Sequence, residues 1–251
     1  MTARLAHIWR HPIKSHGREP LDRVTLEAGR TLPGDRVWAV AHDSARLPDH
    51  PAWMPCANFM RGAKVAALMA IDARLDESAR SVTLTHPDRP EVTIHPDDPA
   101  DAARFLDWVA PLCPADRARP AAIVTVPERG MTDTDFPSVS INNLSSHRAV
   151  SQKLGRDLSV LRWRGNLILD GLAPWEEFDW IDREIAIGGA RLAVRERIGR
   201  CMATTANPET GRRDADTLSV LEEGWGHRDF GVYAEVIESG PVALGDRVEV
   251  L

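Results

Sequence analysis

A Gly-Gly pair between two strand-like runs constrains the fold of this chain more than any other local feature. Residues 190–197 alternate apolar and polar side chains, which is typical of a half-buried β-strand, and residues 184–187 form a second short run. Gly188 and Gly189 join the two runs and readily adopt the positive φ angles of a two-residue hairpin turn. These residues predict an antiparallel hairpin in the second half of the chain.

The rest of the chain repeats short strand-like runs separated by Gly, Pro and Asp turn signals. We expect further strands at 4–10, 21–26, 35–41, 63–73, 81–85, 91–95, 121–126, 138–141 and 230–237, and two short strands within 242–251 around Gly245-Asp246. Three helices are expected, one from Asp98 to Pro111, one capped by Ser145 or Ser146 and ending at Gly155, and one from about Asp214 to Gly224. The predicted fold class is mainly β, with β-barrels or a sandwich and a few helices.

Length and charge limit the classes of protein that this sequence can be. The 251 residues fit one large domain or two small ones. The Pro- and Arg-rich residues 113–120 are the best boundary, which gives domains 1–115 and 116–251. A net charge of −6 argues against a broad nucleic-acid surface. No apolar stretch is long enough for a signal peptide or a membrane span. We therefore expect a cytoplasmic protein with no membrane or nucleic-acid partner.

One cysteine stands out from the other two. The chain contains Cys56, Cys113 and Cys201, an odd number without a CxxC pair, which argues against a disulfide framework and a structural zinc site. Three arginines, at 195, 197 and 200, lie within six residues of Cys201. Nearby positive charge favours the thiolate, the form that acts as a nucleophile or soft-metal ligand. The alternative is that Cys201 is a small buried hydrophobe, which is common for free cysteines.

Cations recur in three other loops, at Lys14-Ser15, at Arg36 and at Arg162, Arg164 and Asn166. Arg36 is predicted to open a buried strand, where it would pair with Asp35 or Asp43 or bind a phosphate through its planar fork of donors. If these loops meet in space, they form an anion-binding pocket around Cys201. The alternative is a set of dispersed surface arginines.

Five motifs, in order along the chain, resemble the MOSC domain family. Residues 199–211, GRCMATTANPETG, are similar to the family pattern R-C-x-x-T-x-x-D-P-x-T-G. Residues 230–234 and 245–248 together are similar to its closing motif, F-G-x-Y followed by G-D-x-V. In the first half, residues 11–15 resemble the Y-P-[VI]-K-S of the MOSC N-terminal β-barrel domain, and residues 34–38 its G-D-R-x-W/F. Residues 164–168 resemble R-P-N-[IV]-x.

The resemblance implies an N-terminal β-barrel-like domain packed on a C-terminal MOSC β-barrel, and a bound molybdenum cofactor. This cofactor is a pterin with a terminal phosphate and a dithiolene that holds the metal. Cys201 falls on the position that ligates molybdenum in the amidoxime-reducing members, and is the predicted metal ligand and catalytic residue. The predicted cofactor-binding residues are Lys14, Ser15, Arg36, Arg164, Asn166, Arg200 and Cys201. At the level of the family, pyridoxal phosphate binding is also expected.

The function that the resemblance implies is reduction of small N-hydroxylated substrates. The sequence ends soon after the last motif without further cysteines, so we expect electrons from a separate flavin, iron–sulfur or haem protein. The alternatives are a carrier of the cofactor or of sulfur, acting through a persulfide on Cys201, and a barrel that has lost the cofactor.

The sequence departs from the family pattern at several positions. His11 replaces the usual aromatic residue, and Asn207 replaces an Asp, although Asn can still cap the turn. Cys56 and Cys113 match no motif, so structural roles are expected for them. The loop at residues 133–137 follows the family segment only roughly, so no site residue is predicted in it.

Overall fold

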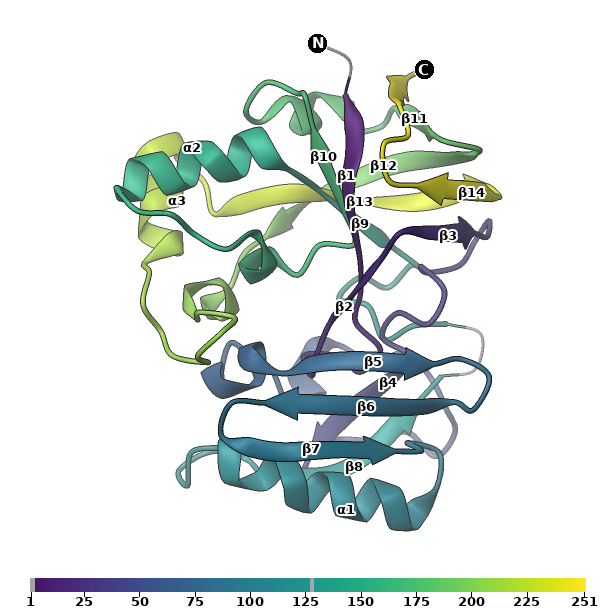
Figure 1. Ribbon diagram of the computed structural model, residues 1–251, viewed down its shortest axis with the longest axis vertical. Helices are drawn as coiled ribbons and strands as arrows, with labels where there is room; N and C mark the ends of the chain where they lie inside the picture. The colour runs from purple at the N-terminus through teal and green to yellow at the C-terminus, as the bar shows by residue number, and fades with distance from the viewer. Residues whose placement is uncertain (1–2, 127–128) are drawn as a thin grey trace.

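The computed structural model describes residues 3–126 and 129–251 and is built mostly of β-strands (Figure 1). The strands are β1 (Arg4–Arg10), β2 (Glu19–Leu21), β3 (Arg23–Leu26), β4 (Trp38–His42), β5 (Asp72–Asp76), β6 (Ser81–His86), β7 (Arg89–Ile94), β8 (Pro120–Thr125), β9 (Val139–Asn143), β10 (Leu167–Asp170), β11 (Glu184–Ile187), β12 (Ala190–Gly199), β13 (Asp229–Glu238), β14 (Gly240–Ala243) and β15 (Val248–Val250). The helices are α1 (Pro99–Val109), α2 (Leu144–Leu154) and α3 (Thr217–Trp225). The predicted class, mainly β with a few helices, is confirmed.

One eight-stranded sheet, curled into a half-barrel, forms the larger layer. Its strand order is β15-β11-β12-β13-β9-β10-β1-β2, and only the β9–β10 pair is parallel among the described strands. The predicted hairpin is β11–β12, and Gly188 in its turn has a φ of 55°. Alternate side chains of these strands, such as Leu192, Val194 and Val232, are fully buried in one apolar core. We call this sheet with α2, α3, β3 and β14 the large-sheet layer.

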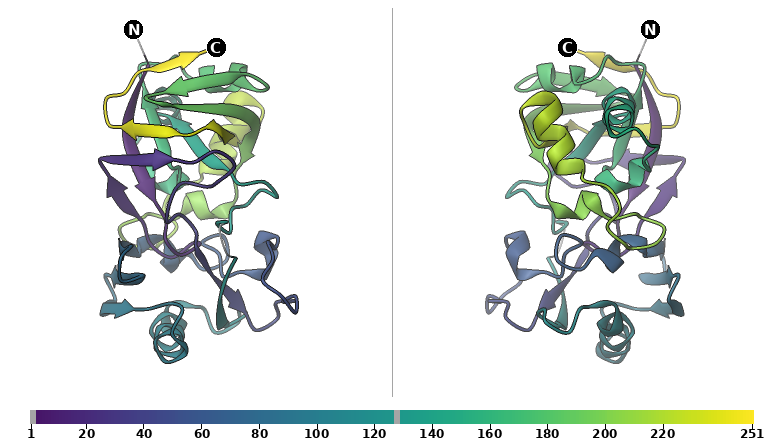
Figure 2. Two further views of the ribbon diagram at one scale, coloured as in Figure 1. Left: turned by 90° about the vertical axis from the view of Figure 1, so that its right-hand side faces the viewer. Right: turned by 90° about the vertical axis from the view of Figure 1, so that its left-hand side faces the viewer.

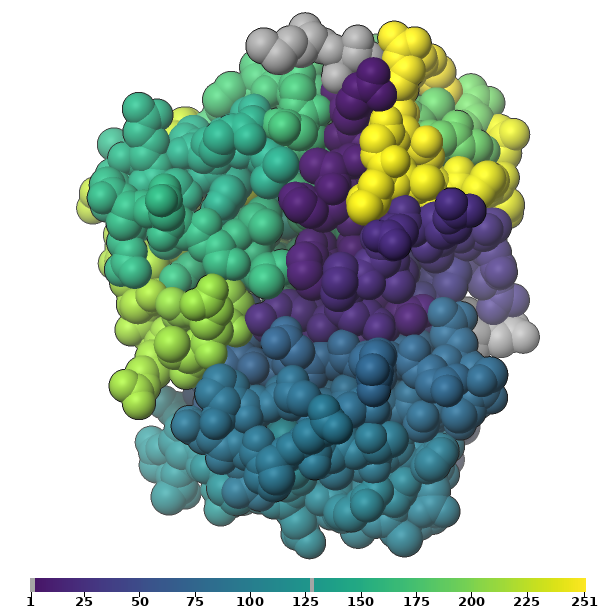
Figure 3. All heavy atoms as spheres, in the orientation of Figure 1, coloured from purple at the N-terminus to yellow at the C-terminus, as the bar shows by residue number. Residues whose placement is uncertain are grey.

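The smaller layer consists of a three-stranded sheet, β5-β6-β7, a two-stranded sheet, β4-β8, and α1. Its core is separate and includes Trp38, Leu68, Val82 and Phe105. Figure 2 shows the two layers from both sides, with α1 at the outer end, and Figure 3 shows this small-sheet layer as a block below the rest of the chain.

The three helices lie close to their predicted positions. The Asp98 side chain caps α1 by accepting hydrogen bonds from the backbone N–H groups of Ala100 and Asp101, at 2.9 and 3.0 Å. Asp216 caps α3. The prediction of a Ser145 or Ser146 cap for α2 is wrong, because the Asn143 side chain accepts from the Ser145 N–H and the helix begins one residue earlier than those serines.

Two predicted strands differ from the structure. Residues 66–70 form a 3-10 helix, and a strand begins only at Asp72, because a short apolar run such as this one fits a buried helical turn as well as a strand. Arg36 does not open a strand, because its φ of 51° places it in a turn before β4. The predicted pairing of Arg36 with Asp35 is confirmed.

The chain passes several times between the two layers. Residues 11–18 leave β1, contact the small-sheet layer and return to β2, and residues 27–37 link β3 to β4. In the first of these two linking segments, the Lys14 N–H donates to the Trp38 carbonyl at 2.8 Å. Strand pairing also crosses the predicted domain boundary, since β1 pairs with β10 and β4 pairs with β8. The division into 1–115 and 116–251 stays a prediction. In the described part of the chain, no helix has both the length and the apolar composition needed to cross a bilayer.

Candidate functional site

A cavity of about 380 Å³ lies between the two layers, and we call it the inter-layer cavity. Its volume falls in the range of small-molecule sites. The residues that line it include Lys14, Ser15, Arg36, Cys56, Arg61, Asp133, Ser140, Arg162, Arg164, Glu196, Arg197, Arg200, Cys201 and Tyr233. Segments far apart in the sequence therefore meet here, as the anion-pocket hypothesis required.

The lining of this cavity is strongly basic. Seven arginine and lysine side chains line it, against the two carboxylates Asp133 and Glu196. This excess stands against a net charge of −6 for the whole chain. Cations concentrated in a concave site attract an anion and hold it more strongly than the same charges spread over the surface. The alternative of dispersed surface arginines does not describe this cavity.

Cys201 follows the end of β12 and is exposed at the cavity wall. The β12–β13 ladder shifts register between Val194 and Glu196 and again between Arg197 and Gly199. Register shifts of this kind bend a strand and re-aim the residues that follow it. The interpretation of Cys201 as a buried hydrophobe is contradicted, and its thiol is accessible to a ligand in the cavity.

Arg200 is fixed by the wall behind Cys201. Its Nε and Nη1 donate to the carbonyls of Phe230 and Trp163 at 2.8 and 2.7 Å, and its Nη2 donates to Asn142 Oδ1 at 3.0 Å. The guanidinium also lies over the stacked Trp163 and Phe230 rings, 5.6 Å from each centroid. Burial lowers the pKa of Arg200 to about 10. Arg200 therefore supplies mainly positive charge, since most of its donors are engaged.

Lys14 reaches the cavity from the first segment that links the layers. Its Nζ donates to the Met131 carbonyl at 2.7 Å and pairs with the Asp133 carboxylate. Burial lowers the pKa of Lys14, and the Asp133 charge partly offsets this effect. For Asp133, burial acts to raise the pKa, but the charge and hydrogen bond of Lys14 outweigh it and the pKa is lowered. An anionic ligand at Lys14 would compete with Asp133.

Arg36 pairs with the buried carboxylate of Asp35, which also accepts a hydrogen bond from the His11 N–H at 2.7 Å. His11 is thus part of the support for Arg36, although it departs from the family motif. Burial, reinforced by the Arg164 charge, lowers the pKa of the His11 imidazole to about 3. The imidazole is therefore neutral at physiological pH, and Asp35 and Arg36 form the charged pair.

Three of the cavity residues have left-handed backbone conformations that non-glycine residues rarely adopt. The φ angles are 64° for Ser15, 51° for Arg36 and 50° for Arg164. Such positions cost stability, and they cluster at binding sites where the surrounding structure holds them. Arg164 donates from Nη2 to the Gly17 carbonyl at 3.2 Å, but its buried Nη1 has no partner. Burial and the neighbouring Arg36 charge lower the pKa of Arg164 to about 9.

Asn166 does not line the cavity. Its Oδ1 accepts hydrogen bonds from the backbone and side chain of Ser140 at 3.1 and 2.7 Å, and its Nδ2 donates to the Trp9 carbonyl at 3.1 Å. Ser140 itself lines the cavity. The contacts give Asn166 a supporting position behind the wall, whereas direct contact with a cofactor stays a prediction.

Residues 131–249 match the family model of the MOSC domain. This part of the chain is a MOSC domain. It contains Cys201 and the arginines at 162, 164 and 200, whereas Lys14 and Arg36 come from outside the matched range. The inter-layer cavity therefore joins the MOSC domain to the first half of the chain.

Two curated relatives share parts of this sequence. The chain is 38% identical over 78 residues to the molybdenum cofactor sulfurase of Anopheles gambiae, which covers 31% of this chain and 10% of the relative. It is 29% identical over 126 residues to the mitochondrial amidoxime-reducing component 1 of Xenopus laevis, which covers 45% of this chain and 36% of the relative. The matches thus span about a tenth and about a third of these two proteins.

One solved structure matches over the whole chain. The YuaD protein of Bacillus subtilis superposes with a TM-score of 0.50, covering 100% of this chain and 96% of that one, at 14% sequence identity. At this identity the likeness concerns the fold alone, and it extends over both layers.

Several residues of the cavity were not predicted from the sequence, and Asp133, Tyr233 and Cys56 stand out among them. Asp133 lies in the loop that followed the family pattern too roughly to use. Tyr233 is the tyrosine of the F-G-x-Y motif, so the motif itself carried the signal. Cys56 lies in the long segment between β4 and β5 and lines the cavity, and the structural role expected for it stays a prediction.

Two other expectations concern the surroundings of Cys201. Arg195 pairs with Glu235 at 2.7 Å and does not line the cavity, although Arg197 does. Asn207 caps its turn as predicted, by accepting from the Glu209 N–H at 2.8 Å. Among the described residues, no three His, Cys, Asp or Glu side chains gather in a way that could hold a metal ion together.

Proposed function

We propose that this protein binds a molybdenum cofactor in the inter-layer cavity and reduces N-hydroxylated compounds with electrons from a separate protein. The observation that carries the proposal is the exposed thiol of Cys201 in a cavity lined by seven cationic side chains. A thiolate suits a high-valent metal that already has sulfur ligands. Guanidinium and ammonium groups suit a terminal phosphate.

The residues of the cavity fit an anionic cofactor in two further respects. Arg164 keeps a buried Nη1 donor without a partner, which leaves a hydrogen bond to be made by a ligand. Ser15, Arg36 and Arg164 all hold strained backbone conformations, which is consistent with side chains positioned for binding rather than for stability. The chain is also similar in part to proteins named molybdenum cofactor sulfurase and amidoxime-reducing component.

Each residue has a distinct part in this proposal. Cys201 would hold the metal, and Lys14, Ser15 and Arg36 would bind the phosphate and the pterin. Arg164 and Arg200 would neutralise the remaining charge. When bound, the cofactor supplies the two-electron chemistry that breaks an N–O bond. Pyridoxal phosphate binding stays an expectation from the family resemblance and is not part of this proposal.

The second candidate function is that of a carrier of the cofactor or of sulfur, with a persulfide on Cys201. The specific observation in its favour is a second thiol, Cys56, in the same cavity. Its Sγ accepts a hydrogen bond from Arg61 Nη1 at 3.4 Å, so a second sulfur that could take part in sulfur exchange is held at the cavity wall. The partial match to the sulfurase agrees with it.

The two functions are separated by metal content and turnover. The protein and its Cys201→Ser variant are produced in a host that makes the pterin cofactor, and their molybdenum content is measured after purification. Turnover is then measured with benzamidoxime and a chemically reduced viologen dye. We expect stoichiometric molybdenum and turnover for the wild type, and loss of turnover for Cys201→Ser.

The matched control is Cys113→Ser, since Cys113 is buried in the small-sheet layer and should keep both properties if the protein folds. Molybdenum-loaded wild type without turnover would exclude the reductase. A mass increase of one sulfur atom on Cys201, without retained metal, would favour the carrier instead.

A further inference from the structure

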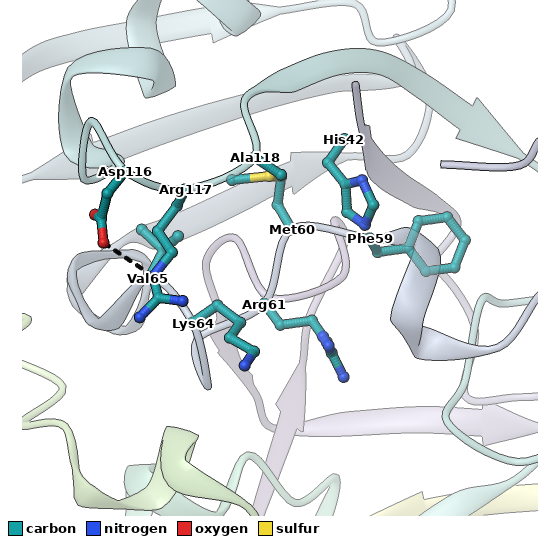
Figure 4. Close-up of a pocket in the computed structure, with 9 residues that line it drawn as sticks. All are labelled: His42, Phe59, Met60, Arg61, Lys64, Val65, Asp116, Arg117 and Ala118. Carbon is teal, nitrogen blue, oxygen red and sulfur yellow. Dashed lines mark ion pairs between the residues drawn. The ribbon is translucent and has the colours of Figure 1, made fainter. Parts of the chain in front are cut away.

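A second cavity, of about 250 Å³, adjoins the inter-layer cavity, and we call it the side cavity (Figure 4). Residues 61–65 lie between the two, with Arg61 lining both, Gly62 and Ala63 lining the first, and Lys64 and Val65 lining the second. None of the sequence motifs or roles described above makes use of the side cavity.

The inner wall of the side cavity is apolar and well packed. Phe59, Met60 and Val65 line it, and their exposed fractions are 2%, 4% and 1%. Close-packed core side chains of this kind give a wall of fixed shape. The wall favours an apolar group, such as an aromatic ring or a short aliphatic chain.

The other side of the cavity carries cations that lack good partners. Arg61 has a buried Nε without a hydrogen bond, and no carboxylate in the described part of the chain pairs with Lys64. Arg117 lies 3.9 Å from the Asp116 carboxylate, which is longer than a hydrogen bond. In Figure 4 the Arg61 and Lys64 side chains extend to the same side, away from Met60. An anionic group there would complete contacts that the protein leaves open.

His42 does not provide a further ligand group. Its Nε2 is 2.8 Å from the Ala57 carbonyl, and its Nδ1 accepts from the Ser44 N–H at 3.2 Å. With Nδ1 accepting, Nε2 carries the proton, so both ring nitrogens are engaged and the ring acts as part of the wall.

We propose that the side cavity binds a small apolar carboxylate. Its body would pack on Phe59 and Val65, and its carboxylate would be held by Arg61, Lys64 and Arg117. A monoanion is favoured over a phosphate for two reasons. Asp116 repels a doubly charged group more strongly, and the apolar wall cannot donate hydrogen bonds to phosphate oxygens.

The position of Arg61 between the cavities gives the side cavity a role in the reaction. Because Arg61 lines both cavities, we infer that a ligand anchored in the side cavity extends towards Cys201 and that the substrates include N-hydroxylated compounds with a carboxylate on an apolar body. This assignment of substrate class rests on the proposed reductase function. Binding of the carboxylate itself does not, and it is tested separately.

The test measures binding to the full chain as purified, by isothermal titration calorimetry and by NMR chemical shifts, with benzoate as the probe. Benzamide, the uncharged analogue, and inorganic phosphate are the comparison ligands. The Lys64→Gln/Arg117→Gln double variant removes two cations of the side cavity, and Arg197→Gln removes one that lines only the inter-layer cavity. Ala118→Trp, at an exposed lining position, fills the side cavity without touching the core.

We expect saturable benzoate binding that weakens about tenfold in the double variant, as loss of charge-assisted hydrogen bonds predicts. Ala118→Trp should abolish binding at an unchanged melting temperature, and Arg197→Gln should leave it unchanged. Absence of saturable binding, equal binding of benzamide or phosphate, or weakening only in Arg197→Gln would overturn the proposal. These binding measurements do not depend on molybdenum or on turnover. A failure of the side-cavity proposal can therefore be distinguished from a failure of the proposed reductase function.

Discussion

Arg164 shows how a single residue can lower stability and still be required at a binding site. Its backbone has a φ of 50°, its guanidinium is buried beside Arg36 with a lowered pKa, and one of its donors has no partner. Each of these features costs free energy in the folded protein. An anionic ligand would remove two of the three costs, because it would compensate the charge and accept the free hydrogen bond.

Two substitutions at Arg164 should have different effects on stability. Arg164→Gly should keep the free energy of unfolding within about 1 kcal/mol of wild type, because glycine adopts positive φ without strain and the buried charge is gone. The free energy of unfolding of Arg164→Val should be about 2 kcal/mol lower than that of Arg164→Gly, because a β-branched residue is strained in that conformation. Urea denaturation measures both.

Both variants should retain less molybdenum than wild type when produced in a cofactor-synthesising host, since both lack the guanidinium. Full retention by Arg164→Gly would show that Arg164 does not bind the cofactor. Equal stability of the two variants would show that the backbone at residue 164 is not strained.

The cavity residues that could be predicted from the sequence differ from the others in a simple way. Lys14, Arg36, Arg164 and Cys201 lie in motifs, and their charge or sulfur chemistry is visible in the sequence itself. Cys56 lines the cavity only because the long segment between β4 and β5 folds against it, and no local pattern records that proximity. Asn166 belongs to a motif but supports Ser140 from behind, because a motif position alone does not separate contact from support.

At the scale of elements, β13 depends on a glycine at the point where it passes the site. Gly231 has a φ of 75°, and a Cβ built there would clash with Asn142 Oδ1 and with the Ile141 carbonyl. Asn142 Oδ1 is the oxygen that accepts from Arg200 Nη2. The close approach of β13 to β9 therefore fixes the arginine next to Cys201.

Gly231→Ala should lower the free energy of unfolding by about 3 kcal/mol or more, through backbone strain and the clash with β9. The matched control is Gly226→Ala after α3, with a similar φ of 72° but open space around the Cβ, and it should cost about 1 kcal/mol. Chemical denaturation compares the two. Similar losses would mean that strain alone, rather than the β9 contact, limits position 231.

Elements were predictable where local rules act and unpredictable where they compete. The Gly188 turn and the start of α1 at Asp98 are set by residues within a few positions, and both were predicted. The apolar run at 66–70 satisfies a buried helical turn as well as a strand, so local information did not decide between them. Asn143 was overlooked as a cap because the two serines that follow it are equally suitable.

At the scale of the whole molecule, the arrangement of the layers follows from pairings between distant segments. β1 near the start of the chain pairs with β10, and β3 pairs with β14 near the other end. Periodicity shows that a strand exists but says nothing about its neighbour. The segments that link the layers carry Lys14 and Arg36, so the same long-range pairing assembles the site.

Two buried histidines in the first linking segment make this assembly sensitive to acid. His11 is 1% exposed and His16 is fully buried, and burial lowers their pKa values to about 3 and about 4, from 6.5. The Arg164 charge lowers both further. The His16 Nδ1 is 2.7 Å from the Lys14 carbonyl, so the ring is tied to the same segment that presents Lys14 to the cavity.

Because the unfolded chain binds protons at these residues below pH 6.5 and the folded chain does not, acid favours unfolding. The free energy of unfolding should fall by about 1.6 kcal/mol per histidine between pH 6.5 and pH 5, and continue to fall until the pH reaches about 4 for His16 and about 3 for His11. Urea denaturation at a series of pH values measures the slope. In NMR spectra of the folded protein, the ring protons of His11 and His16 should not titrate between pH 8 and pH 5. Titration of either ring in that range at constant fold would contradict this account, and it would mean that the linking segment opens to water while the two layers stay folded.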